Sequence, residues 1–517
     1  MASGTETLTS PAAARMNSSL MNPAANRSIP LSLWGALVFF VLLWALDFPK
    51  PMNDDMFYCG AGLNLAQGGD LSNPLIARQE FPGHFYFIYP PVHSYALAGW
   101  LRTFGISAAS MTGFQLLLYA ACAAPTIIFL RRNDAPIWLE WIVPLGIGAA
   151  FLGFGLRPES LAAAITMTGF VLLECRGKAA WALFAGFFLL SLGTATAPRT
   201  APFGAALFLL AGYNQLWRKP EAAGGKNPLR WLTGGAGTLA AFLVFLWMIH
   251  FRVIEFWRTF HFYAQLVGGS KLQLLAMFFT RYLGITQWPV AGALVCIFLL
   301  SLRRPRDPLA GTGMCLAAMV PIGGIIGGLG NGTLWFLILI LLFLTASLLK
   351  QEMTRLRRKT IFFMVAGSLL LANVKTFVNL AGIFTGNIDS KPGANAEKIR
   401  ALGTNAQYPL LIDEPVARYV FDYRLPAGAL DWPFSAPFPK QLPFETNLLP
   451  GDIFLLGPLW AERLTEKGLV KESPTMWSPL PLRQWAFYRH PRQAYVIPAA
   501  VCLKNQTNSS PAPKSLH

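Results

Sequence analysis

The chain has 517 residues, of which 54% are hydrophobic and only 13% are charged. A soluble globular protein carries about 25% charged residues, so this composition excludes a disordered chain, a nucleic-acid-binding arm and a secreted disulfide scaffold as the main theme. It predicts an integral membrane protein with several spans, in which the net charge of +17 needs an explanation other than a nucleic-acid partner.

Apolar runs long enough to cross a hydrocarbon layer of about 30 Å follow one another along most of the chain. The polar N-terminal tail, residues 1–30, has no cleavage site of the signal-peptide kind, so the first run is expected to remain as a helix. The candidate spans lie at 31–46, 112–130, 137–155, 160–175, 179–197, 201–216, 231–250, 285–302, 309–329, 332–349 and 361–385. They predict an all-α polytopic membrane domain over residues 31–385 with about 11 transmembrane helices.

Basic residues predict the orientation of these spans, because loops that stay in the cytoplasm keep an excess of Lys and Arg. Up to residue 385 the chain has 28 basic residues, and 18 of them fall in six segments. These segments are Arg15 with Arg27, Arg131 with Arg132, Arg176 with Lys178, 218–230, 303–306 and 350–359. With eleven spans and a cytoplasmic N-terminus, all six lie on the cytoplasmic side, so most of the positive charge marks topology.

The composition changes after residue 385. The last 132 residues hold 11 of the 25 acids, many prolines and no run able to span. Strand-like stretches at 409–412, 452–456 and 484–488 alternate with helical ones at 394–402 and 459–467. We therefore predict a small α/β domain over residues 386–517, on the outer side of the membrane.

The first outer loop, residues 48–111, opens with two adjacent carboxylates, Asp54 and Asp55. Acids this close to a low-dielectric layer need cations, a metal ion or water beside them. One of the two can act as a general base, with a pKa raised by its charged neighbour. The alternative is a structural role, in which Asp54 caps a helix that begins at Asp55, and the acid pair leaves both interpretations open.

An aromatic-rich stretch, residues 85–95, follows in the same loop and includes Tyr89, a Pro-Pro pair and His93. It is too short and too interrupted to span the membrane. It predicts an interfacial helix in the first outer loop, where Tyr and Phe rings prefer to lie at the membrane surface. Anchoring explains most of the rings, but it explains His93 and the prolines less well.

Two further outer turns carry charge against the membrane: one holds Arg157 and Glu159, and the other holds Arg199. An Arg at the outer end of a span can bind a phosphate through its planar fork of donors. It can equally extend to lipid headgroups, and Arg157 can pair with Glu159. Because these arginines face the same side as the acid pair, Arg157, Arg199 and His93 are candidate phosphate-binding residues, with Glu159 and Tyr89 beside them.

The acid pair after the first span, the Gly-rich helix that follows it and the Tyr89-Pro-Pro stretch resemble the GT-C superfamily of integral membrane glycosyltransferases. That superfamily includes the protein mannosyltransferases and the aminoarabinose transferase of lipid A. The turn with Arg157 and Glu159, the number of spans and the outer C-terminal domain are similar to the family too. The resemblance covers the membrane region in outline.

This resemblance implies transfer of a sugar from a polyprenyl-phosphate donor at the outer membrane interface. It implies Asp55 as the base and, in metal-dependent members, Asp54 and Asp55 as ligands of a divalent metal ion. Base and leaving-group stabiliser then act on opposite faces of the anomeric carbon, which predicts inversion. The acceptor is left open among a glycan, a lipid and a protein, and the family branch suggests a bacterial inner membrane. The basic residues place the N-terminus in the cytoplasm and the C-terminus outside.

The chain departs from the aminoarabinose transferase at one position of interest. Such members place a Glu and a Lys before the Pro-Pro pair, where this chain has Ile88 and Tyr89. That Lys is thought to meet the donor phosphate, so this contact is not carried over. The Tyr-Pro-Pro form is closer to the mannosyltransferase branches.

Two other classes compete with a transferase. A polytopic transporter or lipid flippase fits the number of spans, but its ionisable residues are expected near the middle of the membrane rather than in an outer loop. A scaffold that presents the C-terminal domain leaves the acid pair and the Tyr-Pro-Pro stretch unexplained.

Overall fold

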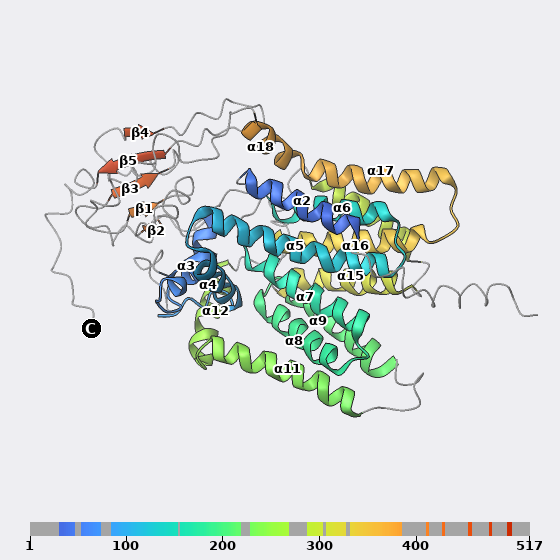
Figure 1. Ribbon diagram of the computed structural model, residues 1–517, viewed down its shortest axis with the longest axis horizontal. Coiled ribbons are helices and arrows are strands. Elements are labelled where there is room, and N and C mark those ends of the chain that lie inside the picture. Colours follow the sequence, from blue (N-terminus) through green and yellow to red (C-terminus); the bar gives the residue numbers. More distant parts are fainter. Residues whose placement is uncertain are drawn as a thin grey trace, which may run out of the picture.

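A computed structural model of the chain describes residues 30–46, 53–73, 84–152, 156–218, 228–267, 287–302, 307–326 and 331–384, and five strands beyond them. Within these ranges, the side chains at 53–57, 108, 262–267, 324–326, 331–332, 375, 379 and 382–384 and in the strands lie outside the description. The described helices run side by side in an elongated bundle (Figure 1).

Each segment predicted to span the membrane contains a helix. These helices are α2 (Leu31–Ala45), α5 (Ala108–Arg132), α6 (Ile137–Phe151), α7 (Pro158–Arg176), α8 (Ala180–Thr196), α9 (Ala201–Gly212), α11 (Pro228–Met248), α14 (Trp288–Ser301), α15 (Pro308–Ile326), α16 (Asn331–Leu349) and α17 (Arg355–Ala372). By length and composition, two described stretches could cross a membrane, Ala109–Arg132 and Pro228–Met248, and shorter apolar helices accompany them. The number of spans therefore stays a prediction.

The prediction of one continuous span over 361–385 is wrong. The helix α17 ends at Ala372, and α18 (Val374–Phe384) begins after a break at Asn373. The Asn373 side-chain amide donates to the carbonyl oxygen of Leu145 in α6 at 2.8 Å and to that of Leu369 at 2.7 Å. Because a short amide side chain competes for backbone carbonyls, Asn373 both interrupts the helix and ties the break to α6.

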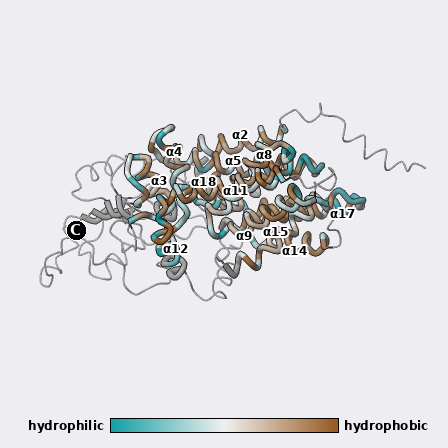
Figure 2. Tube along the Cα trace, turned by 90° about the horizontal axis from the view of Figure 1, so that it is seen from below, coloured by the Kyte–Doolittle hydropathy of each residue, from teal (hydrophilic) through white to brown (hydrophobic). Residues whose placement is uncertain are grey.

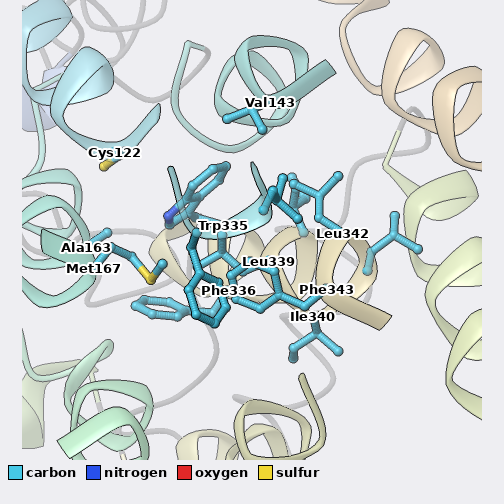
Figure 3. Packing of buried hydrophobic residues seen from close by; sticks show 14 of the residues in the cluster. Cys122, Val143, Ala163, Met167, Trp335, Phe336, Leu339, Ile340, Leu342 and Phe343 are labelled. Atoms are coloured by element: carbon cyan, nitrogen blue, oxygen red, sulfur yellow. The ribbon is translucent and has the colours of Figure 1, made fainter. Parts of the chain in front are cut away.

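The centre of the bundle is α16. Its side chains from Thr333 to Leu349 are all buried, so this helix, which is apolar on every face, is surrounded by other helices. Figure 3 shows Trp335, Phe336 and Phe343 packed among side chains of α5, α6 and α7. This core holds α7, whose first turn carries two of the predicted site residues.

The helices α7 and α8 pack closely through glycines. A Cβ atom at Gly169 would lie 2.8 Å from both the Gly186 carbonyl oxygen and the Leu190 amide nitrogen. Only a residue without a side chain allows the two backbones to approach this far, as is common between membrane helices. The close approach fixes the position of the α7 axis and therefore of its N-terminus.

Basic segments gather at one end of the bundle. The Arg230 guanidinium, at the start of α11, donates to the Gly177 carbonyl after α7 at 2.9 Å and to the Gln215 carbonyl in the π-helical turn η2 (Tyr213–Arg218) at 3.0 Å. Lys350, after α16, pairs with Asp307 before α15 at 2.8 Å. Figure 2 shows apolar helices through the middle and hydrophilic stretches toward the ends, including the start of α17. This arrangement agrees with loops that share one side of a membrane.

The first outer loop lies at the opposite end of the bundle, with α3 (Asn53–Ala66), α4 (Val92–Phe104) and α12 (Val253–Val267) (Figure 1). The interfacial helix predicted over 85–95 is wrong, because residues 84–91 are irregular and α4 begins only after Pro91. Two prolines restrict the backbone before them and cannot continue a helix. The rings from Phe85 to Tyr89 are buried inside this end of the molecule rather than spread on a surface.

Five strands lie beyond α18, at the same end as α3 (Figure 1). They are β1 (Leu410–Ile412), β2 (Ala427–Ala429), β3 (Ile453–Leu456), β4 (Thr475–Trp477) and β5 (Ala494–Pro498), and they form one mixed sheet in the order β2-β1-β3-β5-β4. The strands β1 and β3 lie in two of the predicted strand-like stretches. The third such stretch, 484–488, and the predicted helices at 394–402 and 459–467 lie outside the described residues.

Candidate active site

Tyr58, in α3, lies at the centre of the contacts at the end of the bundle that holds α3, α4 and α12. Its ring meets the Tyr89 ring edge to face, with centroids 4.9 Å apart and an interplanar angle of 86°. Its hydroxyl donates to the Tyr89 hydroxyl at 3.4 Å, and the Arg157 guanidinium carbon lies 5.5 Å from its ring centroid. The structure therefore brings Arg157 and Tyr89, which were predicted from separate motifs, together on one residue of the first outer loop.

The Arg157–Glu159 turn is buried at the N-terminus of α7. Pro158 occupies the first helical position, where its missing N–H costs nothing, and Ser160 donates its hydroxyl to the Arg157 carbonyl at 2.8 Å. Glu159 is 0% exposed, and neither of its carboxylate oxygens has a hydrogen-bond partner among the described residues. Glu159 thus does not form a hydrogen bond with Arg157, and a buried carboxylate without a hydrogen-bond partner costs free energy.

His93 lies in the first turn of α4 and is buried. One ring nitrogen hydrogen-bonds to the backbone of Tyr58, and the other, Nε2, has no partner among the described residues. Burial lowers the pKa of His93 to about 4, and the bond to Tyr58 only partly offsets this effect. At neutral pH the ring is uncharged, so any contact with a phosphate would be a hydrogen bond without a full positive charge.

The buried His93 predicts an acid-sensitive protein. Because the folded pKa of about 4 lies below the unfolded value of 6.5, only the unfolded state takes up a proton between these values. Stability attributable to His93 should therefore fall as pH drops from 6.5 toward 4, by roughly 3 kcal/mol in total. Thermal unfolding of purified protein across this pH range checks it: the stability of His93→Gln should depend on pH less steeply than that of the parent. Parallel curves for the parent and His93→Gln contradict the prediction.

The predicted acids lie in the first turn of α3. This helix begins at Asn53, so Asp54 is inside it and is not the cap of a helix that begins at Asp55. Asp54 and Asp55 precede Tyr58 by four and three residues, the spacing of neighbouring positions on a helix surface. Their side chains lie outside the described part of the chain, so their distances to Arg157 and to a metal ion stay untested.

A metal site is not evident in the described part of the chain. No group of three or more His, Cys, Asp or Glu side chains there is placed to hold a metal ion. The predicted ligands, Asp54 and Asp55, are not among the side chains on which this statement rests. No step of the proposed chemistry below depends on a metal.

Arg199 lies in the turn between α8 and α9, at the same end of the bundle as Arg157 (Figure 1). Its side chain is half-buried. Since α7 packs against both α8 and α9, the two arginines lie on neighbouring helices.

A second group of contacts fastens the first outer loop to the turn between α11 and α12. The Phe85 ring stacks on the His250 ring, with centroids 5.5 Å apart. The Arg252 guanidinium carbon lies 4.7 Å from the centroid of the Phe85 ring. Glu255 accepts hydrogen bonds from the Phe85 amide at 3.2 Å and from Arg252 at 3.1 Å. These contacts were not predicted, because no local sequence pattern marks them. In the structure, His250 and Phe251 adopt positive φ of 52° and 59°, which costs free energy in non-glycine residues.

A third group closes the C-terminal end of α3. Asp70 lies 2.6 Å from His84 and accepts a hydrogen bond from the Ser72 amide at 2.9 Å, while Asn64 donates to the Asp70 and Ser72 carbonyls. Burial alone would raise the pKa of Asp70, but the hydrogen bonds from Ser72 and His84 outweigh it and lower this pKa to about 2. Asp70 is therefore ionised at neutral pH, and its bonds to Ser72 and His84 stabilise the conformation of the loop.

The whole bundle resembles a solved membrane-protein structure. A crystal structure of ArnT from Cupriavidus metallidurans bound to undecaprenyl phosphate matches with a TM-score of 0.52, over 89% of this chain and 97% of that chain, at 13% sequence identity. No protein-family model matches the sequence, and no curated protein does either. At this identity the likeness shows the fold alone: the chain has the fold of that ArnT structure, which is GT-C-like.

Proposed function

We propose that the chain is a membrane glycosyltransferase that moves a sugar from a polyprenyl-phosphate donor to an acceptor at the end of the bundle that holds α3, α4 and α12. The observation that carries the proposal is the contact of buried Arg157 with Tyr58, in the same helix as Asp54 and Asp55. The GT-C-like fold supports it, as does the undecaprenyl phosphate bound in the ArnT structure.

In the proposed reaction, the Asp55 carboxylate takes the proton of the acceptor hydroxyl while the acceptor oxygen bonds to the anomeric carbon of the sugar. The bond from that carbon to the phosphate oxygen breaks, and the polyprenyl phosphate leaves with the electron pair. Arg157 stabilises the charge of the departing phosphate through charge-assisted hydrogen bonds, with Arg199 as a second cation. Attack and departure on opposite faces invert the anomeric centre.

The buried Glu159 fits a role beside this reaction. A carboxylate held without a partner costs free energy, and hydroxyl groups of a bound sugar would satisfy it. His93, uncharged at neutral pH, and Tyr89 would complete the polar lining. The acceptor is expected to bind to the outer loops and to residues 386–517. The basic end of the bundle is expected to face the cytoplasm, with the helices in a bacterial inner membrane.

Purified protein incubated with a radiolabelled polyprenyl-phosphate sugar and a membrane extract tests the proposal. We expect label to pass from the donor lipid to an acceptor fraction, with the released polyprenyl phosphate appearing at the same rate. In the assay and in its control the membrane extract comes from cells that lack the protein. The control omits the purified protein. No transfer with any polyprenyl-phosphate hexose or pentose, together with movement of the intact lipid across a vesicle bilayer, would favour a flippase instead.

A further inference from the structure

The contacts of Tyr58 reach from α3 to three other parts of the outer end. Its ring and hydroxyl meet Tyr89 in the irregular segment before α4, its backbone receives the hydrogen bond from His93 in α4, and its ring faces Arg157 at the start of α7. Tyr58 itself is buried. Apart from Arg157, three contacts hold Tyr58: the ring and hydroxyl contacts with Tyr89 and the backbone hydrogen bond from His93. The ring is therefore held by two other parts of the chain and can position the guanidinium that lies over it.

We propose that Tyr58 is a positioning residue, which holds the Arg157 guanidinium in a set place relative to the acid pair of α3. The inference rests on the proposed function, in which Arg157 meets the donor phosphate and Asp55 takes the acceptor proton. In this proposal Tyr58 acts through Arg157 and takes no chemical part in the transfer itself.

The type of contact suits this task. An arginine side chain has several rotatable bonds, so a site that needs its charge in one place has to restrain it. Pairing with Glu159 would restrain Arg157 but would also offset its charge, and Glu159 makes no hydrogen bond to it. The face of an aromatic ring attracts the guanidinium without using its N–H groups as donors, which are the groups that bind phosphate.

Tyr58 also lies on the same helix as the acid pair. Asp54 and Asp55 lie within one helical turn of Tyr58 on the rigid helix α3, whereas Arg157 lies about 100 residues later on α7. The ring of Tyr58 therefore links the base-bearing helix directly to the arginine. Its own support comes from Tyr89 and His93, so the segment before α4 and the start of α4 brace the link.

Two substitutions separate the ring from the hydroxyl. Tyr58→Phe keeps the ring face and should retain transfer within about threefold, whereas Tyr58→Leu removes the face and should lower kcat about 10- to 100-fold, since a misplaced catalytic group costs rate steeply. In an Arg157→Gln background, Tyr58→Leu should cost less than about threefold more, because both changes remove the same interaction. A structural defect alone would lower the activity of both backgrounds by the same factor.

A second measurement does not need activity. Phenylglyoxal modifies accessible guanidinium groups, and mass spectrometry of the digested protein gives the rate at Arg157. The rate should rise in Tyr58→Leu by about 10-fold, in keeping with loss of a buried cation–π contact, and should stay near the parent value in Tyr58→Phe. Phe170→Leu, which removes a core ring far from the site, controls for general loosening and should leave the rate at Arg157 unchanged.

The two measurements separate the possible failures. If the parent transfers no sugar but labelling at Arg157 follows the expected order, the proposed function fails and the hold of Tyr58 on Arg157 stands. If the parent is active and Tyr58→Leu matches it in both kcat and labelling, the inference about Tyr58 is wrong. Equal losses in Tyr58→Phe and Tyr58→Leu also overturn it, because the ring face would then not be what matters.

Discussion

Sugar transfer by the Asp55→Asn variant should be about 10²- to 10⁴-fold slower than transfer by the parent, because a general base contributes that much and an amide cannot take the proton of the acceptor. The loss should appear in kcat, while the KM for the donor changes little, since the donor phosphate is bound by other groups. Initial rates with a polyprenyl-phosphate sugar at several donor concentrations measure both quantities. Asp54→Asn in parallel shows which of the two acids is the base.

The matched control for Asp55→Asn is Asp70→Asn in the same outer loop. Asp70 is an acid with assigned partners, since it bonds to Ser72 and His84. We expect its substitution to loosen the loop and to lower transfer only severalfold. The pH dependence of kcat and of KM should stay that of the parent. Parent-like rates in both Asp54→Asn and Asp55→Asn would remove the acid pair from the mechanism.

The positions of the membrane helices could be predicted from sequence because their cause is local. A run of apolar residues of the right length is helical in a membrane, where backbone groups have no water to bond. The exception at Asn373 has a long-range cause: the side chain bonds to Leu145, more than 200 residues earlier, and no local pattern carries that information. The two helices α17 and α18 therefore appeared as one run.

The first outer loop was predicted less well, for a related reason. The rings between Phe85 and Tyr89 were expected at the membrane surface, since aromatic composition alone favours an interface. They are buried among other elements: Phe85 stacks on His250 in the turn between α11 and α12, Phe87 packs against Phe256 in α12, and Tyr89 packs against Tyr58 in α3. The two prolines in the sequence indicate that no helix crosses this segment. No sequence pattern indicates that its rings are buried.

Part of the site followed from residue chemistry, and part needed geometry. Arg157, Glu159, Tyr89 and His93 were selected as ionisable or polar residues next to apolar runs, and all four are buried at the outer end. Tyr58 was missed, although it lies one helical turn after Asp54, because a tyrosine in an aromatic-rich loop has no pattern of its own. Burial also changes the role of His93, whose lowered pKa makes it neutral.

Binding of the donor should depend on Arg157 more than on any other cation at the outer end. Arg157→Gln should weaken binding of undecaprenyl phosphate and should lower kcat/KM about 10²- to 10³-fold, as expected for loss of one charged donor to a developing anion in a buried site. Arg157→Lys should fall between the two, because an ammonium keeps the charge but loses the planar pair of donors. Binding of undecaprenyl phosphate to purified protein and transfer rates check both variants.

The matched control is Arg230→Gln at the opposite end of the bundle. Arg230 bonds to the carbonyls of Gly177 and Gln215, so its loss should lower the thermal stability without a selective effect on undecaprenyl phosphate. The salt dependence of lipid binding supplies a further test. Because the Arg157 side chain is buried, binding of undecaprenyl phosphate through it should respond weakly to salt, unlike binding at an exposed cation. If Arg157→Gln binds the lipid as tightly as the parent, the phosphate is held elsewhere, and Arg199 becomes the arginine to test, since it lies at the same end of the bundle.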